Sequence, residues 1–360
     1  MPAIRTLLLL TCGMACLAIA VDPACADDPP RQQGLRVYGG NLDNPSGIAV
    51  QPGTGDVFVA ERRGIFRLTA PQPRGTAAEK PPKRRFAEVN GFPTDVYGKG
   101  PMYDIGPLGV AFIDAKHLVV GDGSRPDGKE LVYIFEVGEE PAAKPQKESA
   151  ASQKLGPIPP SDETVSGEGN FYGVVVHDGA IYITNNGDDT KGWVSRSKLT
   201  DGKAGPLELY IATKVAVEVD APVGITANDK GELVVGQMGE MTVPGDSLLT
   251  FYDAATGELK AKYETGLSDI AGVAYSPRTG KLYAVDFSWH DPSQGGLFEL
   301  TVADGKCTSK KLFSLDKPTA LAFDENGHLF IATYGTAEEG SNRKPGKIYR
   351  VGARRLAQAG

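Results

Sequence analysis

The pattern of apolar and polar positions repeats along this chain. Six times, a short apolar run leads into a turn rich in Gly, Pro, Asp or Asn, and then into a second run of β-branched and aromatic residues. The first copy reads "PSGIAVQPGTGDVFVAE" and the last reads "PTALAFDENGHLFIAT". Within each copy, 12 to 14 residues separate a small anchoring residue from the polar residue that closes the second run. A constant unit at a variable spacing predicts a β-hairpin carried on loops of adjustable length.

The apolar positions within each run are successive rather than alternating, so both faces of each strand are expected to be covered. No long helix-period pattern follows residue 26. Repeated, buried, short strands of this kind predict an all-β fold, a six-bladed β-propeller of four-stranded blades. The anchoring residues are Gly47, Gly109, Gly173, Gly224, Gly272 and Ala320, and the closing residues are Glu61, Asp122, Asn185, Gln237, Asp286 and Thr333.

The last repeat lacks a fourth strand. It reaches "KIYRV" (347–351) and the sequence ends soon afterwards, whereas "GLRVYGG" (34–40) stands alone before the first copy. We therefore expect this N-terminal strand to pair with the last blade and close the ring, which removes two open sheet edges.

The remaining segments are predicted from composition. Residues 1–26 begin with Arg5, continue with an apolar run and end in a small-residue cleavage site near Ala26, which predicts a signal peptide and a secreted or periplasmic protein. The propeller is expected over 27–352, with exposed loop insertions at 71–85 and 139–169, and a C-terminal tail over 353–360.

Composition narrows the classes of partner. The chain has 360 residues and a formal net charge of −7, which disfavours nucleic acid and anionic lipid as partners. Of its four cysteines only Cys307 follows the cleavage site, so neither an intrachain disulfide nor a cysteine-based metal cluster is expected. No membrane span is expected after the signal peptide, and we expect a monomer.

The repeated phrase, with its Pro-x-Gly-Ile-Ala-Val opening and Leu-Phe-Val-Ala-Asp/Glu ending, resembles NHL-type propellers and the SMP-30/gluconolactonase superfamily. The resemblance covers roughly residues 34–351 and implies the same six-bladed fold, which hosts both enzymes and binding modules. In the related lactonases a metal-binding Asp occupies the register of Asp286. In those lactonases a Glu ligand and an Asn ligand stand just before the small residue of the first strand. The residues at that position in this chain include no carboxylate: they are Ser46, Leu108, Tyr172, Val223, Ala271 and Thr319.

The strand-closing polar residues are the first candidates for a site, because the ends of the second strands share one mouth of the channel. Glu61, Asn185 and Asp286 come from alternate blades and could together hold Ca²⁺ or another divalent cation. The alternative is that these side chains only cap backbone N–H groups of turns.

Further candidates follow from the same loops. In "DFSWHDPSQGG" (286–296), His290 beside Asp286 is a candidate general base, and Trp289 is a candidate apolar wall. A ligand at the channel mouth would also meet the other strand-closing residues Asp122, Gln237 and Thr333.

Two functional hypotheses remain. The first is a secreted, NHL-like scaffold that binds a protein or a small molecule at the channel mouth, with no cofactor required. The second, implied by the resemblance, is a metal-assisted lactonase or esterase that uses Asp286 with Glu61, Asn185 and His290.

Overall fold

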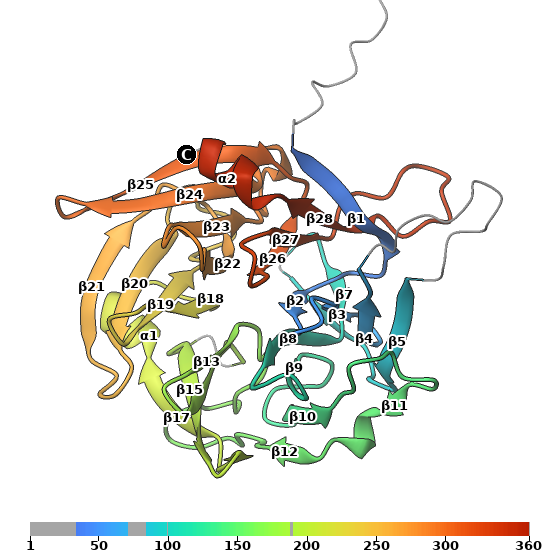
Figure 1. The fold of residues 1–360 in the computed structure, drawn as a ribbon. Coiled ribbons are helices and arrows are strands. Elements are labelled where there is room, and N and C mark those ends of the chain that lie inside the picture. The colour runs from blue at the N-terminus through green and yellow to red at the C-terminus, as the bar shows by residue number, and fades with distance from the viewer. Residues whose placement is uncertain (1–33, 71–83, 99, 188–189, 360) are drawn as a thin grey trace, which may run out of the picture. The chain divides into compact units, whose positions relative to one another are not determined.

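The computed structural model describes residues 34–70, 84–98, 100–187 and 190–359. These residues form six sheets arranged in a ring, which confirms the predicted six-bladed propeller (Figure 1). The predicted signal peptide and residues 71–83 of the first predicted insertion lie outside the described residues.

Each blade is built around one of the predicted hairpins, which forms its two inner strands. The first strands are β2 (Gly47–Val50), β8 (Pro107–Phe112), β13 (Val174–His177), β18 (Pro222–Ala227), β22 (Ile270–Tyr275) and β26 (Pro318–Phe323). The second strands are β3 (Val57–Glu61), β9 (His117–Asp122), β14 (Ala180–Asn185), β19 (Glu232–Gln237), β23 (Leu282–Asp286) and β27 (Leu329–Thr333). All six inner pairings are antiparallel.

The outer strands complete four-stranded blades. The third strands are β4 (Gly64–Leu68), β10 (Val132–Glu136), β15 (Trp193–Thr200), β20 (Leu248–Asp253), β24 (Gly296–Ala303) and β28 (Gly346–Val351). The fourth strands are β5 (Arg85–Asn90), β12 (Gln153–Leu155), β17 (Glu208–Ala212), β21 (Leu259–Glu264), β25 (Lys306–Ser314) and β1 (Leu35–Leu42).

The N-terminal strand closes the ring, as the sequence predicted. β1 pairs antiparallel with β28, from Leu35 opposite Val351 to Leu42 opposite Gly346, so the earliest described strand and the last strand lie side by side (Figure 1). The residues of the predicted C-terminal tail form the short helix α2 (Ala353–Ala359), in which Leu356 is buried.

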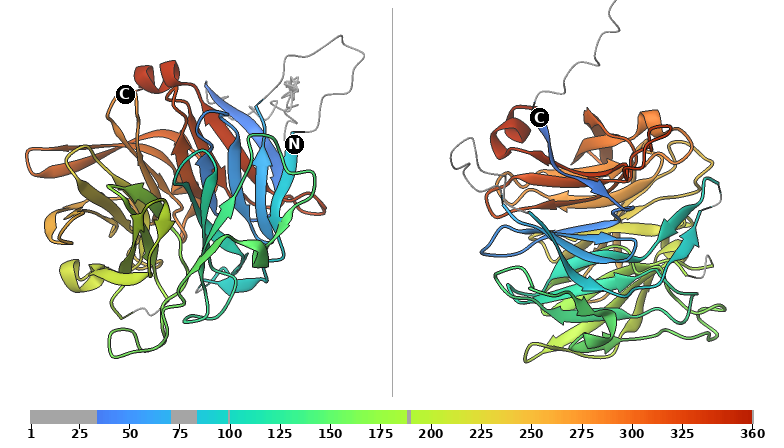
Figure 2. Two further views of the ribbon diagram at one scale, coloured as in Figure 1. Left: turned by 60° about the horizontal axis from the view of Figure 1, so that its bottom comes forward. Right: turned by 90° about the vertical axis from the view of Figure 1, so that its right-hand side faces the viewer.

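Successive residues of a strand pack against opposite neighbours, because adjacent sheets face each other (Figure 2). On β3, Phe58 contacts the apolar cluster shared with the second blade, whereas Val57 and Val59 belong to the cluster shared with the last blade. All five residues of β3 are buried. This two-sided burial explains why the sequence shows continuous apolar runs rather than alternation.

The anchoring glycines mark where neighbouring blades approach most closely. A β-carbon added at Gly47 would lie 2.0 Å from the Leu108 carbonyl oxygen, and one added at Gly109 would lie 2.0 Å from the Tyr172 carbonyl oxygen. Separations this short are not seen for real side chains, so the backbones pack without an intervening side chain. The repeated small residue is therefore a requirement of the packing.

The predicted loop insertion 139–169 is partly structured. It supplies the fourth strand β12 of the second blade, and its β11 (Gln146–Lys147) pairs in parallel with β5 of the first blade. The segment also holds the single-turn helix η1 (Glu148–Ala150). The fully buried Arg67 donates to the carbonyl oxygens of Gly138 and Glu139 at 2.8 Å, which anchors the start of the segment. The segment is therefore less exposed than the predicted loop, because it pairs with strands of two blades.

The remaining elements lie in connections between strands. They are the two-stranded hairpin of β6 (Asp95–Tyr97) and β7 (Tyr103–Ile105), the short strand β16 (Lys203–Ala204), the helix α1 (Thr213–Val217) and the turn η2 (Pro292–Gln294). In the part of the chain that the structure describes, no helix has the length and apolar character needed to cross a membrane.

We predict that Gly109→Ala destabilises the fold, because the nearest atom to its new methyl group would be the backbone carbonyl oxygen of Tyr172, which cannot move aside as a side chain can. The expected loss in free energy of unfolding is about 1–3 kcal/mol, measured by chemical denaturation. Gly40→Ala in β1 is the matched control, since nothing lies within 4 Å of its added β-carbon. Equal stability of the two variants would contradict the role assigned to the close approach.

Candidate functional site

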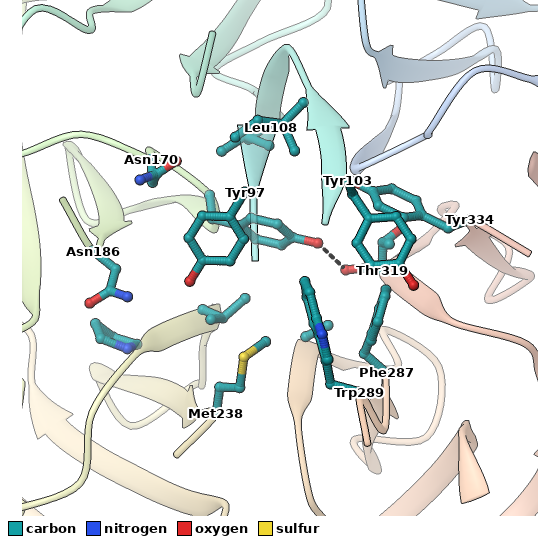
Figure 3. Close-up of a pocket in the computed structure, with 15 residues that line it drawn as sticks. Tyr97, Tyr103, Leu108, Asn170, Asn186, Met238, Phe287, Trp289, Thr319 and Tyr334 are labelled. Atoms are coloured by element: carbon teal, nitrogen blue, oxygen red, sulfur yellow. Dashed lines mark hydrogen bonds between the residues drawn. The ribbon is translucent and has the colours of Figure 1, made fainter. Parts of the chain in front are cut away.

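One mouth of the channel holds an aromatic cavity, which we call the mouth cavity (Figure 3). Its walls come from the connections between second and third strands and between successive blades. Its volume is about 60 Å³. It is lined by Tyr97, Tyr103, Ile105, Leu108, Asn170, Tyr172, Asn186, Pro222, Val223, Met238, Ala271, Phe287, Trp289, Thr319 and Tyr334.

The floor of the mouth cavity is formed by the residues that precede the anchoring positions. Five of these six residues line it: Leu108, Tyr172, Val223, Ala271 and Thr319. The Tyr172 hydroxyl donates to the Thr319 carbonyl oxygen at 2.9 Å and so reaches from the third blade to the last. Tyr172 also lines a small space on the other side, among the first strands. It therefore divides the channel, and burial raises its pKa well above the usual value, so the ring stays neutral.

The walls are aromatic side chains in contact with one another, mostly edge to face. Tyr97 and Tyr103 come from the β6–β7 hairpin, which belongs to no blade. The ring centroid of Tyr103 lies 5.2 Å from that of Trp289 and 5.4 Å from that of Tyr334, and the Phe287 and Trp289 centroids are 4.8 Å apart. Such contacts between rings fix their orientations and keep the cavity preformed.

None of the six strand-closing polar residues is among the residues that line this cavity, and in four blades the next residue lines it instead. Asn186, Met238, Phe287 and Tyr334 each follow a strand-closing residue and line the mouth cavity. The strand-closing side chains themselves are buried, with at most 2% of any of them exposed. Side chains of consecutive residues in an extended chain point in opposite directions. The strand-closing residue therefore points into the fold, whereas the residue after it points into the cavity.

The three predicted metal ligands each contact protein donors. Glu61 accepts two hydrogen bonds of 2.7 Å from Arg85 and one of 2.8 Å from the Asp43 N–H. The Asn185 amide donates to Glu168 and accepts from the Ser195 hydroxyl. Burial raises the pKa of Glu61, and Arg85 opposes that rise.

Asp286 is surrounded by backbone donors. Its carboxylate accepts the N–H groups of Ser268, Asp269 and Ser288 at 2.8–3.1 Å. Burial raises the pKa of Asp286, and these three hydrogen bonds lower it. Among the described residues no group of three His, Cys, Asp or Glu side chains is placed to hold a metal ion. A metal site that combines Asp286 with Glu61 and Asn185 stays a prediction.

The other predicted ligand-binding residues contribute differently. Asp122 pairs with Arg125 and accepts from Ser124, the Gln237 side chain donates to the Val219 carbonyl oxygen, and Thr333 donates to the Lys347 carbonyl oxygen. None of the three is among the residues that line the mouth cavity. Their role in binding a ligand stays a prediction.

Trp289 does line the cavity, as an apolar wall, which is where the sequence placed it. Its backbone N–H donates to Asp269 at 2.5 Å, and burial raises the pKa of Asp269 to about 7. His290 is exposed and is not among the lining residues, and the Asp286 carboxylate is occupied by the backbone donors described above. General-base catalysis by His290 stays a prediction.

Of the six aromatic residues that line the mouth cavity, the sequence indicated Trp289 as part of a site and did not indicate the other five. Phe287 and Tyr334 could have been found as the residues directly after the strand-closing positions. Tyr172 could have been found as the one large residue among those preceding the anchors. No local signal indicated Tyr97 and Tyr103, because their hairpin reaches the channel only through the tertiary fold.

Comparison with known proteins supports the fold. No family model matches this sequence, and no curated protein sequence does. Among solved structures, PQQ-bound aldose sugar dehydrogenase from Streptomyces coelicolor is similar with a TM-score of 0.55 and 16% identity, over 88% of this chain and 96% of the other. The soluble aldose sugar dehydrogenase of Escherichia coli in its apo-form gives a TM-score of 0.55 and 13% identity, over 89% and 99%. A luciferin-regenerating enzyme gives a TM-score of 0.54 and 12% identity, over 88% and 94%.

At these identities the likeness shows a shared propeller fold and no more. The six-bladed architecture implied by the sequence resemblance is confirmed. Membership of the NHL or SMP-30 group stays a prediction.

We predict that Asp286→Ala lowers the free energy of unfolding by about 3 kcal/mol, because three backbone N–H groups lose their acceptor inside the fold. Asp286→Asn should lose about half as much, since it keeps one acceptor oxygen. Chemical denaturation measures both. A loss below about 0.5 kcal/mol in the alanine variant would contradict the structural role.

The same variants test the predicted cation site. If Asp286 only holds backbone groups, the loss of stability is the same in Ca²⁺ and in EDTA. A melting temperature that rises with Ca²⁺ in the unmodified protein, but not in Asp286→Ala, would instead support the metal prediction.

Proposed function

We propose that this protein is a binding module that takes a small organic molecule into the mouth cavity. The observation that carries the proposal is the convergence of six aromatic side chains from different parts of the ring on one preformed space: Tyr97, Tyr103, Tyr172, Phe287, Trp289 and Tyr334. Concave, mostly apolar sites with a few polar groups are the usual form of small-molecule sites.

Binding is favoured over hydrolysis by the chemistry of the lining. None of the described residues that line the mouth cavity carries a carboxylate, an imidazole, an amine or a thiol. Such groups are the usual general acids, bases and nucleophiles. The hydroxyl groups of Tyr103, Tyr172 and Tyr334 also line the cavity, but burial raises the pKa of each, which keeps them protonated near neutral pH. A metal-dependent lactonase or esterase would use Glu61, Asn185 and Asp286 instead, after exchanging their present contacts for a cation.

The cofactor of the Streptomyces relative is not transferred to this chain. PQQ is a quinone that carries several carboxylate groups, and such a molecule needs cationic partners. No Arg, Lys or His is among the described residues that line the mouth cavity. The lining therefore does not fit this cofactor, and quinone-dependent sugar oxidation is not proposed.

The size of the mouth cavity limits the group that enters it. An apolar cavity of about 150 Å³ holds benzene, whereas this one offers about 60 Å³. With the side chains as they stand, the entering group is smaller than a benzene ring, such as the end of a short branched alkyl chain.

We also propose that the protein acts outside the cytoplasm, on the strength of the N-terminal sequence pattern. Mass spectrometry of the protein from its native host should find a mature N-terminus near residue 26. An N-terminus at Met1 would contradict this proposal.

The binding proposal is tested with 3-methylbutan-1-ol as a neutral alkyl probe. In ligand-observed NMR, we expect saturation transfer to the methyl groups of the probe, and in a Trp193→Phe variant we expect a change in the fluorescence of Trp289. Ala271→Leu should reduce probe binding at least about fivefold, because the larger side chain fills the cavity floor.

The matched control is Ala303→Leu, at the exposed end of β24. It should bind the probe like the unmodified protein. Absence of probe binding to the unmodified protein, or equal binding by Ala271→Leu, would overturn the proposal.

A further inference from the structure

The indole nitrogen of Trp289 is a buried hydrogen-bond donor in the wall of the mouth cavity. Trp289 is 8% exposed and lines this cavity together with Tyr97 and Tyr103 (Figure 3). Its Nε1 has no hydrogen-bond partner among the described residues. The N–H group of a buried tryptophan usually finds an acceptor, and it can donate but not accept. A ligand that enters the mouth cavity is one source of that acceptor.

The position of this N–H group is fixed by the neighbouring rings. The ring centroids of Phe287 and Tyr103 lie 4.8 Å and 5.2 Å from that of Trp289, so the indole has little freedom to turn. A β-carbon added at Gly98 would lie 2.9 Å from Cζ2 of Trp289, which is joined to Nε1 through one shared carbon. The nitrogen-bearing edge of the indole therefore lies beside Gly98, which lines a second, larger space of about 210 Å³. That space shares Tyr97 with the mouth cavity and so adjoins it.

Trp193 shows that a missing partner is not by itself a sign of a ligand. Its Nε1 also has no hydrogen-bond partner among the described residues, and Trp193 is 7% exposed. Trp193 is not among the described residues that line the mouth cavity, and no ligand is proposed for it. What distinguishes Trp289 is that its unpartnered donor lies in the wall of a preformed cavity. Trp193 therefore provides a matched control.

The lining of the mouth cavity determines which acceptor fits this donor. An anionic acceptor would be buried there without a cation, because no Arg, Lys or His is among the described lining residues. A hydroxyl group accepts a hydrogen bond but also brings a donor that needs its own acceptor. The Oδ1 atom of Asn186 also lacks a partner and offers such an acceptor, so an alcohol is included in the test. The carbonyl oxygen of a ketone only accepts and matches the single N–H group of the Trp289 side chain.

We propose that the ligand is a small aliphatic ketone, whose oxygen accepts a hydrogen bond from Nε1 of Trp289 while its alkyl group occupies the mouth cavity. This inference rests on the proposed function and adds the ligand class to it. The mouth cavity offers about 60 Å³, which suits a short branched alkyl group. The space of about 210 Å³ beside Gly98 leaves room for the second substituent of the carbonyl carbon. Binding of this kind involves no covalent step.

The test uses three probes that share one branched skeleton. They are 3-methylbutan-2-one, 3-methylbutan-2-ol and 2,3-dimethylbut-1-ene, which has a CH2 group in place of the carbonyl oxygen. The chain has two tryptophans, so 15N-labelled protein gives two indole N–H signals in NMR spectra, and Trp193→Phe assigns them. We expect the ketone to move the proton signal of Trp289 downfield, because a hydrogen bond to a carbonyl deshields the proton. The alkene should fill the same space without this shift, and the Trp193 signal should respond to neither probe.

The affinities of the probes give a second readout. Ligand-observed NMR titrations should show the ketone binding at least about threefold more tightly than the alcohol, because the alcohol has to place its own donor. Trp289→Phe should weaken the ketone about fivefold more than the alkene, since it keeps an aromatic wall but removes the N–H group. Trp193→Phe, which removes an indole N–H group outside the cavity, should change neither affinity. If Trp289→Phe does not fold, the indole shift in the unmodified protein still decides.

The outcomes separate the inference from the proposed function. If the ketone binds without moving the Trp289 signal, or moves it no more than the alkene does, the inference is wrong and the binding function stands. The same conclusion follows if the alcohol binds as tightly as the ketone, or if Trp289→Phe weakens the ketone and the alkene equally. If neither these three probes nor 3-methylbutan-1-ol bind, the proposed function fails and the inference fails with it.

Discussion

The structure depends on one packing constraint, the contact between the first strands of adjacent blades. At Gly109 a β-carbon would lie 2.0 Å from the carbonyl oxygen of Tyr172, so the two backbones meet directly. Because this approach recurs around the ring, the first strands surround a narrow channel and the apolar side chains are displaced to the flanks of each sheet. There they pack against the neighbouring blades on both sides. The aromatic residues of the mouth cavity are used differently, because they gather at one end of the channel.

The same contact decides what fills the channel. The residue before each anchor lies at the end of the first strand, where the blades begin to diverge, and five of these residues form the floor of the mouth cavity. Four are small or aliphatic, and Tyr172 is long enough to reach the last blade. The channel is therefore divided rather than open, and the proposed ligand would reach the mouth cavity from one mouth only. The floor of the mouth cavity is thus built from one equivalent position in five of the repeats, and Tyr172 is the position at which a large residue replaces a small or aliphatic one.

The sequence was sufficient for the fold because each blade repeats the same local signal. The hairpins, their six-fold repetition and closure by β1 all rest on short-range patterns, and all are confirmed. The segment 139–169 was predicted less well, since β11 and β12 exist only through pairing with strands whose register the local sequence does not show. For the mouth cavity, the pattern located the right end of each blade, and in four blades the lining residue is the one that follows the strand-closing residue. The contribution of the β6–β7 hairpin to the cavity could not be predicted, because its local sequence does not indicate which part of the ring it covers.

The buried polar residues at the strand ends and the aromatic residues after them perform complementary tasks. Glu61 binds the Asp43 N–H, Gln237 binds the Val219 carbonyl oxygen, and Asp286 binds the N–H groups of Ser268 and Asp269. In each case the end of a second strand is tied to the connection that enters the same blade. A loop fixed at both ends can present a large side chain in one orientation without spending binding energy on ordering it. A carboxylate one residue before an aromatic wall is thus a means of positioning that wall, and a strand-end acid in a propeller need not be a ligand in order to serve the site.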